Sequence, residues 1–128
     1  MIYIDTSVVL AQLLAEDRTP PATLWAEPLA SSRLLQYELW NRIHARGLGR
    51  SHGEDVRHLL GRIAFLELTP SVLARALEPF AVPVRTLDAL HLASAEFLRQ
   101  QAQEVRIATY DERMIHAARR LGIAEFAI

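Results

Sequence analysis

A chain of 128 residues with 51% hydrophobic content can bury one core but is short for two, so we expect a single domain over residues 1–128. The net charge of -1 gives no basic coat of the kind that binds nucleic acid nonspecifically. The absence of cysteine excludes disulfides, thiolate metal sites and cysteine nucleophiles. Any chemistry must therefore use oxygen or imidazole groups.

The first half of the chain alternates between strand and helix patterns. A β-branched and aromatic run predicts the first strand, and polar residues lead from it into a helix. Further along, Ser51 and Glu54 have the spacing of a capping box, followed by apolar residues at helical spacing. In order, we expect a strand at 2–4, helices at 8–14 and 22–29, a strand at 33–37, and helices at 37–45 and 51–63.

The second half continues the alternation. Thr86 is placed to cap a long helix, and Gly122 is placed to close the last helix in the C′ position. In order, we expect a strand at 65–68, a helix at 70–77, an extended piece at 82–84, a helix at 86–101, a strand at 105–109, a helix at 111–121 and a strand at 123–128. This order predicts an α/β fold with a central, mostly parallel sheet of four to five strands flanked by helices.

The chain opens without the basic segment, apolar run and cleavage site of a secretory signal. No apolar run approaches the ~20 residues that a membrane helix needs. We therefore expect a cytoplasmic protein with no membrane partner.

Acidic residues fall where expected strands and helices join. Asp5 follows the first strand, Asp111 follows the strand at 105–109, and Glu38 lies where an extended stretch becomes a helix. Asp88 lies in the first turn of another helix. Ligands of open α/β sheets bind at the carboxyl ends of the strands, so these acids converge if the first strand and that at 105–109 are neighbours.

Carboxylates brought so close repel one another, and a divalent cation relieves the repulsion. Hard oxygen ligands suit Mg²⁺ or Mn²⁺, and such an ion activates water and neutralises charge on a phosphate, which favours phosphodiester hydrolysis. The alternative for any single Asp at a helix start is a capping role, although Thr86 makes Asp88 a poor cap. For Glu38 the alternative is an exposed helix face.

Four segments of the chain resemble the VapC-type toxins of the PIN-domain ribonucleases. They are Tyr3-Ile4-Asp5-Thr6-Ser7-Val8, Tyr37-Glu38-Leu39-Trp40-Asn41, Arg85-Thr86-Leu87-Asp88-Ala89-Leu90-His91-Leu92-Ala93 and Ala108-Thr109-Tyr110-Asp111-Glu112-Arg113-Met114. The third segment is the most specific of them. Order, spacing and total length agree, so the resemblance covers the whole chain.

This resemblance implies a three-layer PIN-like fold and an endoribonuclease toxin of a type II toxin–antitoxin system. The acidic quartet around Mg²⁺ or Mn²⁺ would be Asp5, Glu38, Asp88 and Asp111. The middle segment varies most in the family, so Glu27 and Glu54 are rivals of Glu38. The implied partners are an RNA substrate, a cognate VapB-type antitoxin and a second copy of the chain.

Polar residues beside the quartet have two interpretations each. The resemblance makes the Thr109 hydroxyl a companion of the metal, and Thr6 and Ser7 either contact the metal ligands or cap the helix, with capping favoured. Asn41 lies one turn after Glu38 and would contact metal-bound water or phosphate. His91, one turn after Asp88, is interpreted as a buried or hydrogen-bonded structural residue rather than as a metal ligand or acid–base group.

Arginines near these segments are candidates for contacts with RNA. Arg42, Arg46 and Arg50 recur at every fourth position, as a stripe for RNA phosphates or as a solvated face. Arg85 is a further phosphate contact or a salt-bridge partner.

Two other functions remain open at this point. One is a non-catalytic PIN-like module that binds RNA or protein, against which the complete quartet argues. The other is an Asp-dependent phosphatase or phosphotransfer domain, although the chain has neither a second Asp two positions after Asp5 nor any lysine.

Overall fold

The short apolar strand at the N-terminus forms the centre of the fold. In the computed structural model, which describes residues 1–15, 17–101 and 104–128, all paired strands are parallel and lie in the order β3-β2-β1-β4-β5. The strands are β1 (Ile2–Ile4), β2 (Leu29–Ser32), β3 (Ile63–Leu66), β4 (Arg106–Ala108) and β5 (Ala124–Glu125). The predicted α/β fold with a central parallel sheet is confirmed.

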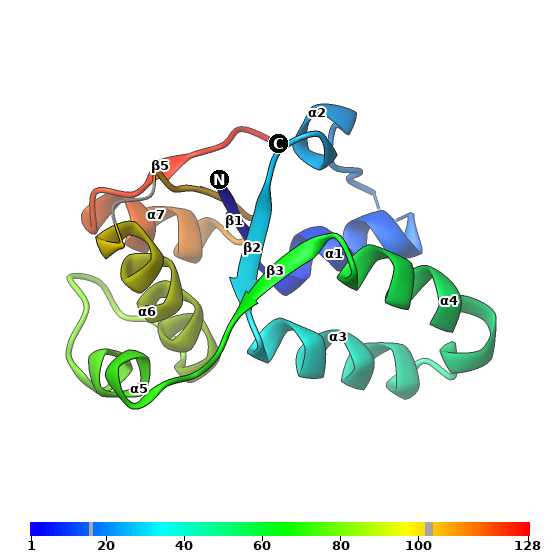
Figure 1. Cartoon of the computed structure of the whole chain (residues 1–128), viewed down its shortest axis with the longest axis horizontal. Helices are drawn as coiled ribbons and strands as arrows, with labels where there is room; N and C mark the ends of the chain where they lie inside the picture. Colours follow the sequence, from blue (N-terminus) through cyan, green and yellow to red (C-terminus); the bar gives the residue numbers. More distant parts are fainter. Residues whose placement is uncertain (16, 102–103) are drawn as a thin grey trace.

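Helices cover both faces of this sheet and make three layers. They are α1 (Thr6–Leu14), α2 (Ala22–Trp25), α3 (Leu34–Ala45), α4 (Gly49–Leu60), α5 (Pro70–Leu77), α6 (Thr86–Gln100) and α7 (Glu112–Arg120). Figure 1 shows α1, α3 and α4 on one side of the strands and α5, α6 and α7 on the other. Within the described ranges, no helix combines the length and the apolar character required to cross a bilayer.

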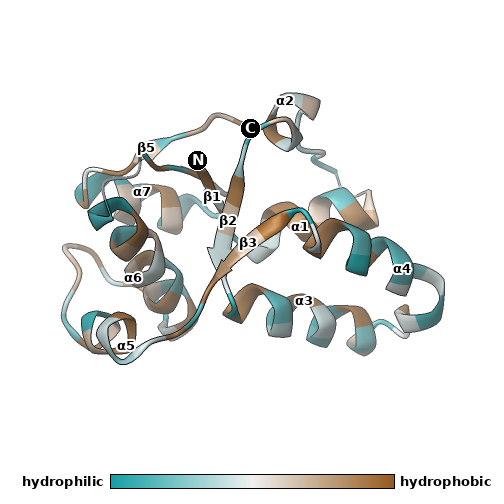
Figure 2. Ribbon diagram, in the orientation of Figure 1, coloured by the Kyte–Doolittle hydropathy of each residue, from teal (hydrophilic) through white to brown (hydrophobic). Residues whose placement is uncertain are grey.

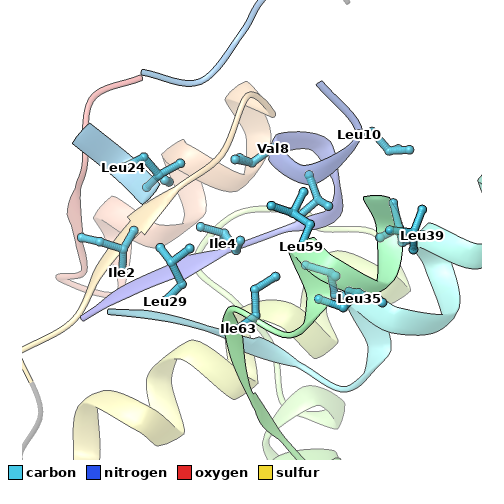
Figure 3. Packing of buried hydrophobic residues seen from close by; sticks show 14 of the residues in the cluster. Ile2, Ile4, Val8, Leu10, Leu24, Leu29, Leu35, Leu39, Leu59 and Ile63 are labelled. Carbon is cyan, nitrogen blue, oxygen red and sulfur yellow. The ribbon is translucent and has the colours of Figure 1, made fainter. Parts of the chain in front are cut away.

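Alternation along β1 divides the core between the two helical layers. Ile2 and Ile4 belong to the cluster that packs under α1, α3 and α4, which also contains Leu24, Leu29 and Leu59 (Figure 3). Tyr3 points the other way, into the cluster formed with α6 and α7. Figure 2 shows hydrophobic colour along β3 and the start of β2, and hydrophilic colour along much of α4.

The second strand is the main correction to the expected elements. It occupies Leu29–Ser32, which overlaps the end of the helix expected at 22–29 and otherwise falls in a gap between expected elements, whereas the strand expected at 33–37 forms the start of α3. Every residue of β2 is buried, and the Ser31 hydroxyl donates to the carbonyl of Ile4 at 2.6 Å. The Ser32 hydroxyl accepts the backbone N–H of Leu34, which starts α3. Two buried serines therefore make up half of this interior strand.

Smaller differences concern the ends of elements. The Ser51 hydroxyl contacts the carbonyl of Leu48 and the His52 ring, so the expected capping box does not form and α4 begins at Gly49. Thr86 is the first residue of α6 rather than its cap. Residues 82–84 join none of the described strands, and the last strand shortens to β5. Gly122 has a φ of 77°, which confirms the expected helix end.

Candidate active site

The four predicted acids line one cavity, of about 730 Å³, at the carboxyl ends of the strands. Because β1 and β4 are hydrogen-bonded neighbours, Asp5 after β1 and Asp111 after β4 meet at the same edge of the sheet. Glu38 reaches this edge from α3, and Asp88 reaches it from the first turn of α6. The structure thus brings together all four residues that the sequence indicated.

Asp5 is the most buried of the four acids, with 6% of its surface exposed. Its Oδ1 accepts the hydroxyl of Ser7 and its Oδ2 accepts the hydroxyl of Thr109, each at 2.6 Å. Burial raises the pKa of the Asp5 carboxyl, the two hydroxyl donors oppose the rise, and the nearby charge of Asp111 adds to it. Asp5 holds the N-cap position of α1, yet its side chain makes no capping bond.

Two hydroxyls connect Asp5 to the loop that follows β4. The Thr109 hydroxyl accepts the backbone N–H of Asp111 at 3.0 Å, and the Ser7 hydroxyl accepts the backbone N–H of Tyr110 at 3.1 Å. The expectation that Ser7 caps the helix is therefore wrong, because its hydroxyl is engaged with Asp5 and Tyr110. These bonds fix the start of α1 against the β4–α7 loop.

Glu38 is held by two donors that come from different elements. The Thr6 hydroxyl donates to Glu38 Oε1 at 2.8 Å, so the capping role expected for Thr6 is also wrong. His91 Nε2 lies 2.6 Å from the same oxygen, and His91 Nδ1 lies 2.7 Å from the Tyr3 hydroxyl. The prediction that His91 is buried and hydrogen-bonded is confirmed. The partner acid, however, is Glu38 and not the nearby Asp88.

Arg85 joins the other two acids. Its Nε lies 3.2 Å from Asp88 Oδ2 and its Nη2 lies 3.2 Å from Asp111 Oδ2, while two thirds of the Arg85 side chain remains exposed. Asp111 Oδ1 also caps α7, because it accepts the backbone N–H groups of Arg113 and Met114. Of the two roles expected for Arg85, the structure therefore displays the salt bridge.

The donor set fits a hard divalent cation by its chemistry, since all four groups are carboxylates. Among the described residues, no three acidic or histidine side chains stand close enough to enclose a metal ion in their present positions. Arg85 instead supplies positive charge between Asp88 and Asp111. Asp5, Glu38, Asp88 and Asp111 therefore offer ligands of the right chemistry at one cavity, but not in positions that enclose an ion.

The rim of the cavity is rich in arginine. Asn41 and Arg42 line it from α3 and Arg46 from the position just after that helix, whereas Arg50 lies on α4, so the expected stripe of three does not stay on one element. Sequence reasoning missed Arg18, which lies in a segment expected only to be a loop. Its guanidinium lies 4.6 Å from the ring centroid of Tyr110, and both residues line the cavity.

Comparisons with known proteins agree with this architecture. The family model described as PIN domain matches residues 2–120. Ribonuclease VapC47 and Ribonuclease VapC46 of Mycobacterium tuberculosis are each 33% identical to the chain, covering 95% and 98% of it and 93% and 96% of those proteins. A toxin–antitoxin complex from Klebsiella pneumoniae contains a chain with a TM-score of 0.65 and 13% identity, covering 100% of this chain and 96% of that one, and this likeness concerns the fold alone. The chain therefore belongs to the PIN-domain family and, within it, to the VapC type.

Proposed function

We propose that the four carboxylates are the catalytic centre with which this VapC-type chain, as a metal-dependent endoribonuclease toxin, hydrolyses RNA phosphodiester bonds. The observation that carries the proposal is their convergence: four acids from four separate parts of the chain line one cavity. The curated relatives are named ribonucleases, which supports RNA as the substrate.

The proposed cation is Mg²⁺ or Mn²⁺, held by Asp5, Glu38, Asp88 and Asp111. When bound, it supplies an activated water and neutralises charge that develops on the phosphate. Ser7 and Thr109 orient Asp5 through one hydroxyl on each carboxylate oxygen, so the most buried acid keeps one fixed position. Thr6 does the same for Glu38.

The arginines at the rim would bind the RNA backbone. Guanidinium groups form paired hydrogen bonds with phosphate, and Arg42 and Arg46 line the cavity beside Glu38, with Asn41 as a neutral donor next to Arg42 in sequence. Arg85 would change its partners during this cycle. It now pairs with Asp88 and Asp111, and a cation bound by those acids would displace it. The displaced guanidinium would be available to a phosphate at the cavity.

A cognate antitoxin of the VapB type is the proposed inhibitor. The Klebsiella pneumoniae structure is a toxin–antitoxin complex, and the likeness of one of its chains to this fold supports a partner of this kind. A second copy of the chain is proposed as a further partner, and sedimentation of the purified protein measures whether it is a dimer.

The proposal is tested by incubating purified protein with RNA and Mg²⁺ or Mn²⁺, with and without EDTA. Asp5→Asn keeps the size of the side chain but removes its charge, and we expect it to abolish cleavage. Asp55→Asn, at an exposed position on α4, is the matched control and should cleave RNA as the unmodified protein does. Cleavage that persists in EDTA or in Asp5→Asn contradicts the proposal. RNA binding without cleavage would instead favour a non-catalytic module.

A further inference from the structure

A buried chain of hydrogen bonds leads from the middle of β1 to Glu38. The Tyr3 hydroxyl accepts the backbone N–H of Ser32 at 3.1 Å and lies 2.7 Å from His91 Nδ1. His91 Nε2 then lies 2.6 Å from Glu38 Oε1. The Tyr3 and His91 rings meet edge to face, with an angle of 76° between their planes. The chain thus joins β1, β2, α6 and α3.

The partners on each side determine where the protons lie. The Glu38 carboxylate only accepts hydrogen bonds, so His91 Nε2 must carry a proton and donate it. Burial raises the pKa of the Tyr3 hydroxyl, which therefore keeps its proton. Since this hydroxyl already accepts from Ser32, it is free to donate to His91 Nδ1. The tautomer with its proton on Nε2 satisfies every atom of the chain.

Packing alone does not explain these two polar side chains. Tyr3 is fully buried in a cluster with apolar residues such as Leu92, Ile107 and Met114, where an apolar ring would pack as well. A buried hydroxyl or imidazole is costly unless it is hydrogen-bonded; here the Tyr3 hydroxyl also satisfies the Ser32 N–H, and the chain through His91 ends at one carboxylate. That carboxylate lines the cavity and is 21% exposed.

We propose that His91 and Tyr3 are positioning residues that hold Glu38 Oε1 and so turn Oε2 toward the cation. The inference rests on the proposed metal centre. Among the residues that the structure describes, the two donors to Glu38, His91 and Thr6, both bind Oε1, which leaves Oε2 for a metal. Partners that orient a metal-binding group typically change metal affinity by ~10–100-fold when they are removed.

Two conservative variants of His91 separate its two ring nitrogens. His91→Gln places an amide nitrogen near the position of Nε2 and can still donate to Glu38. His91→Asn places its amide near Nδ1, where it faces Tyr3 and leaves Glu38 without this donor. We expect Mn²⁺ to bind His91→Asn about 10–100-fold more weakly than the unmodified protein, and His91→Gln to recover most of the affinity. Calorimetry of Mn²⁺ binding measures both.

A second measurement determines which ring nitrogen of His91 carries the proton, and it does not depend on metal. In ¹⁵N NMR spectra of the metal-free protein, His91 should show a protonated Nε2 and an unprotonated Nδ1, with its signal assigned from its loss in His91→Gln. Tyr3→Phe should shift the Nδ1 signal, because it removes the hydroxyl. A ring with its single proton on Nδ1, or one unaffected by Tyr3→Phe, overturns the inference even if a His91 variant fails to fold.

Asp5→Asn distinguishes failure of this inference from failure of the metal centre. If Asp5→Asn loses Mn²⁺ binding while folded His91→Asn binds Mn²⁺ normally, the metal centre stands and the positioning role is refuted. If Asp5→Asn also binds Mn²⁺ normally, the metal centre itself is wrong. Equal weakening in His91→Asn and His91→Gln contradicts the assignment of the donor to Nε2.

Discussion

Replacing Thr109 by valine removes one hydroxyl from the centre of the site and leaves the shape of the side chain nearly unchanged. Thr109 is 2% exposed; its hydroxyl donates to Asp5 Oδ2 at 2.6 Å and accepts the N–H of Asp111 at 3.0 Å. A hydrogen bond to a charged group contributes about 1.5–3 kcal/mol, and an unpaired N–H costs a further ~1–3 kcal/mol. Because the Asp111 amide is only partly buried, we expect Thr109→Val to lower the free energy of unfolding by ~2–4 kcal/mol near pH 7.

The pH dependence of this loss follows from Asp5. Burial raises the pKa of Asp5 in the folded protein, so the folded state binds more protons than the unfolded state between the unfolded and the folded pKa. The contribution of Asp5 to stability is therefore largest in acid and falls as the pH rises through the folded pKa. Without the Thr109 donor, the pKa of Asp5 rises further. The stability gap between the two proteins should accordingly widen from acid toward neutral pH.

Urea unfolding of the metal-free protein, followed by circular dichroism at several pH values, measures this gap. Thr23→Val is the matched control, because Thr23 is exposed on α2, and its effect should stay within ~0.5 kcal/mol. Equal stability of Thr109→Val and the unmodified protein at pH 7, or a gap that widens toward acid, would refute the reasoning.

Two further predictions concern the outer acids and the core. Arg85→Gln removes the positive charge between Asp88 and Asp111, so the metal-free variant should melt at a lower temperature than the unmodified protein. In a thermal-shift assay, added Mn²⁺ should raise the melting temperature of the variant more than that of the unmodified protein. An equal rise in both proteins would contradict this. Leu39→Ala opens a cavity in the fully buried core and should cost about 2–5 kcal/mol in urea unfolding, whereas Leu73→Ala, at an exposed position on α5, should cost far less.

Local patterns predicted the parallel sheet well but missed its second strand. The β-branched run at β1 and the proline at the start of α5 act within a few residues, so the sequence alone shows them. The strand β2 contains Ser31 and Ser32, which look like loop residues. Their burial depends on Ile4 and Tyr3, which lie 27 and 29 residues away. No periodic pattern of residues within one element shows that these serines will be buried.

The same distinction applies to the site. Asp5 and Asp111 could be placed because each follows a strand, and parallel strands end at one edge. Spacing along the helix places His91 one turn from Asp88 and suggests that acid as its neighbour. In the structure His91 bonds to Glu38, which is 53 residues away. That pairing requires α6 and α3, which pack on opposite sides of the strands, to meet at the carboxyl edge of the sheet. It depends on packing between layers, which the spacing of residues along one helix does not determine.

The four acids divide into two pairs that are held in different ways. Asp5 and Glu38 receive hydrogen bonds from hydroxyl and imidazole groups inside the protein, which fix their positions. Asp88 and Asp111 are instead joined by Arg85, whose side chain is 66% exposed. Exposed ion pairs are weak and are screened by salt, so this guanidinium is readily displaced. A cation bound as proposed would therefore be held by an inner pair whose positions are set by hydrogen bonds, and would compete with Arg85 for the outer pair.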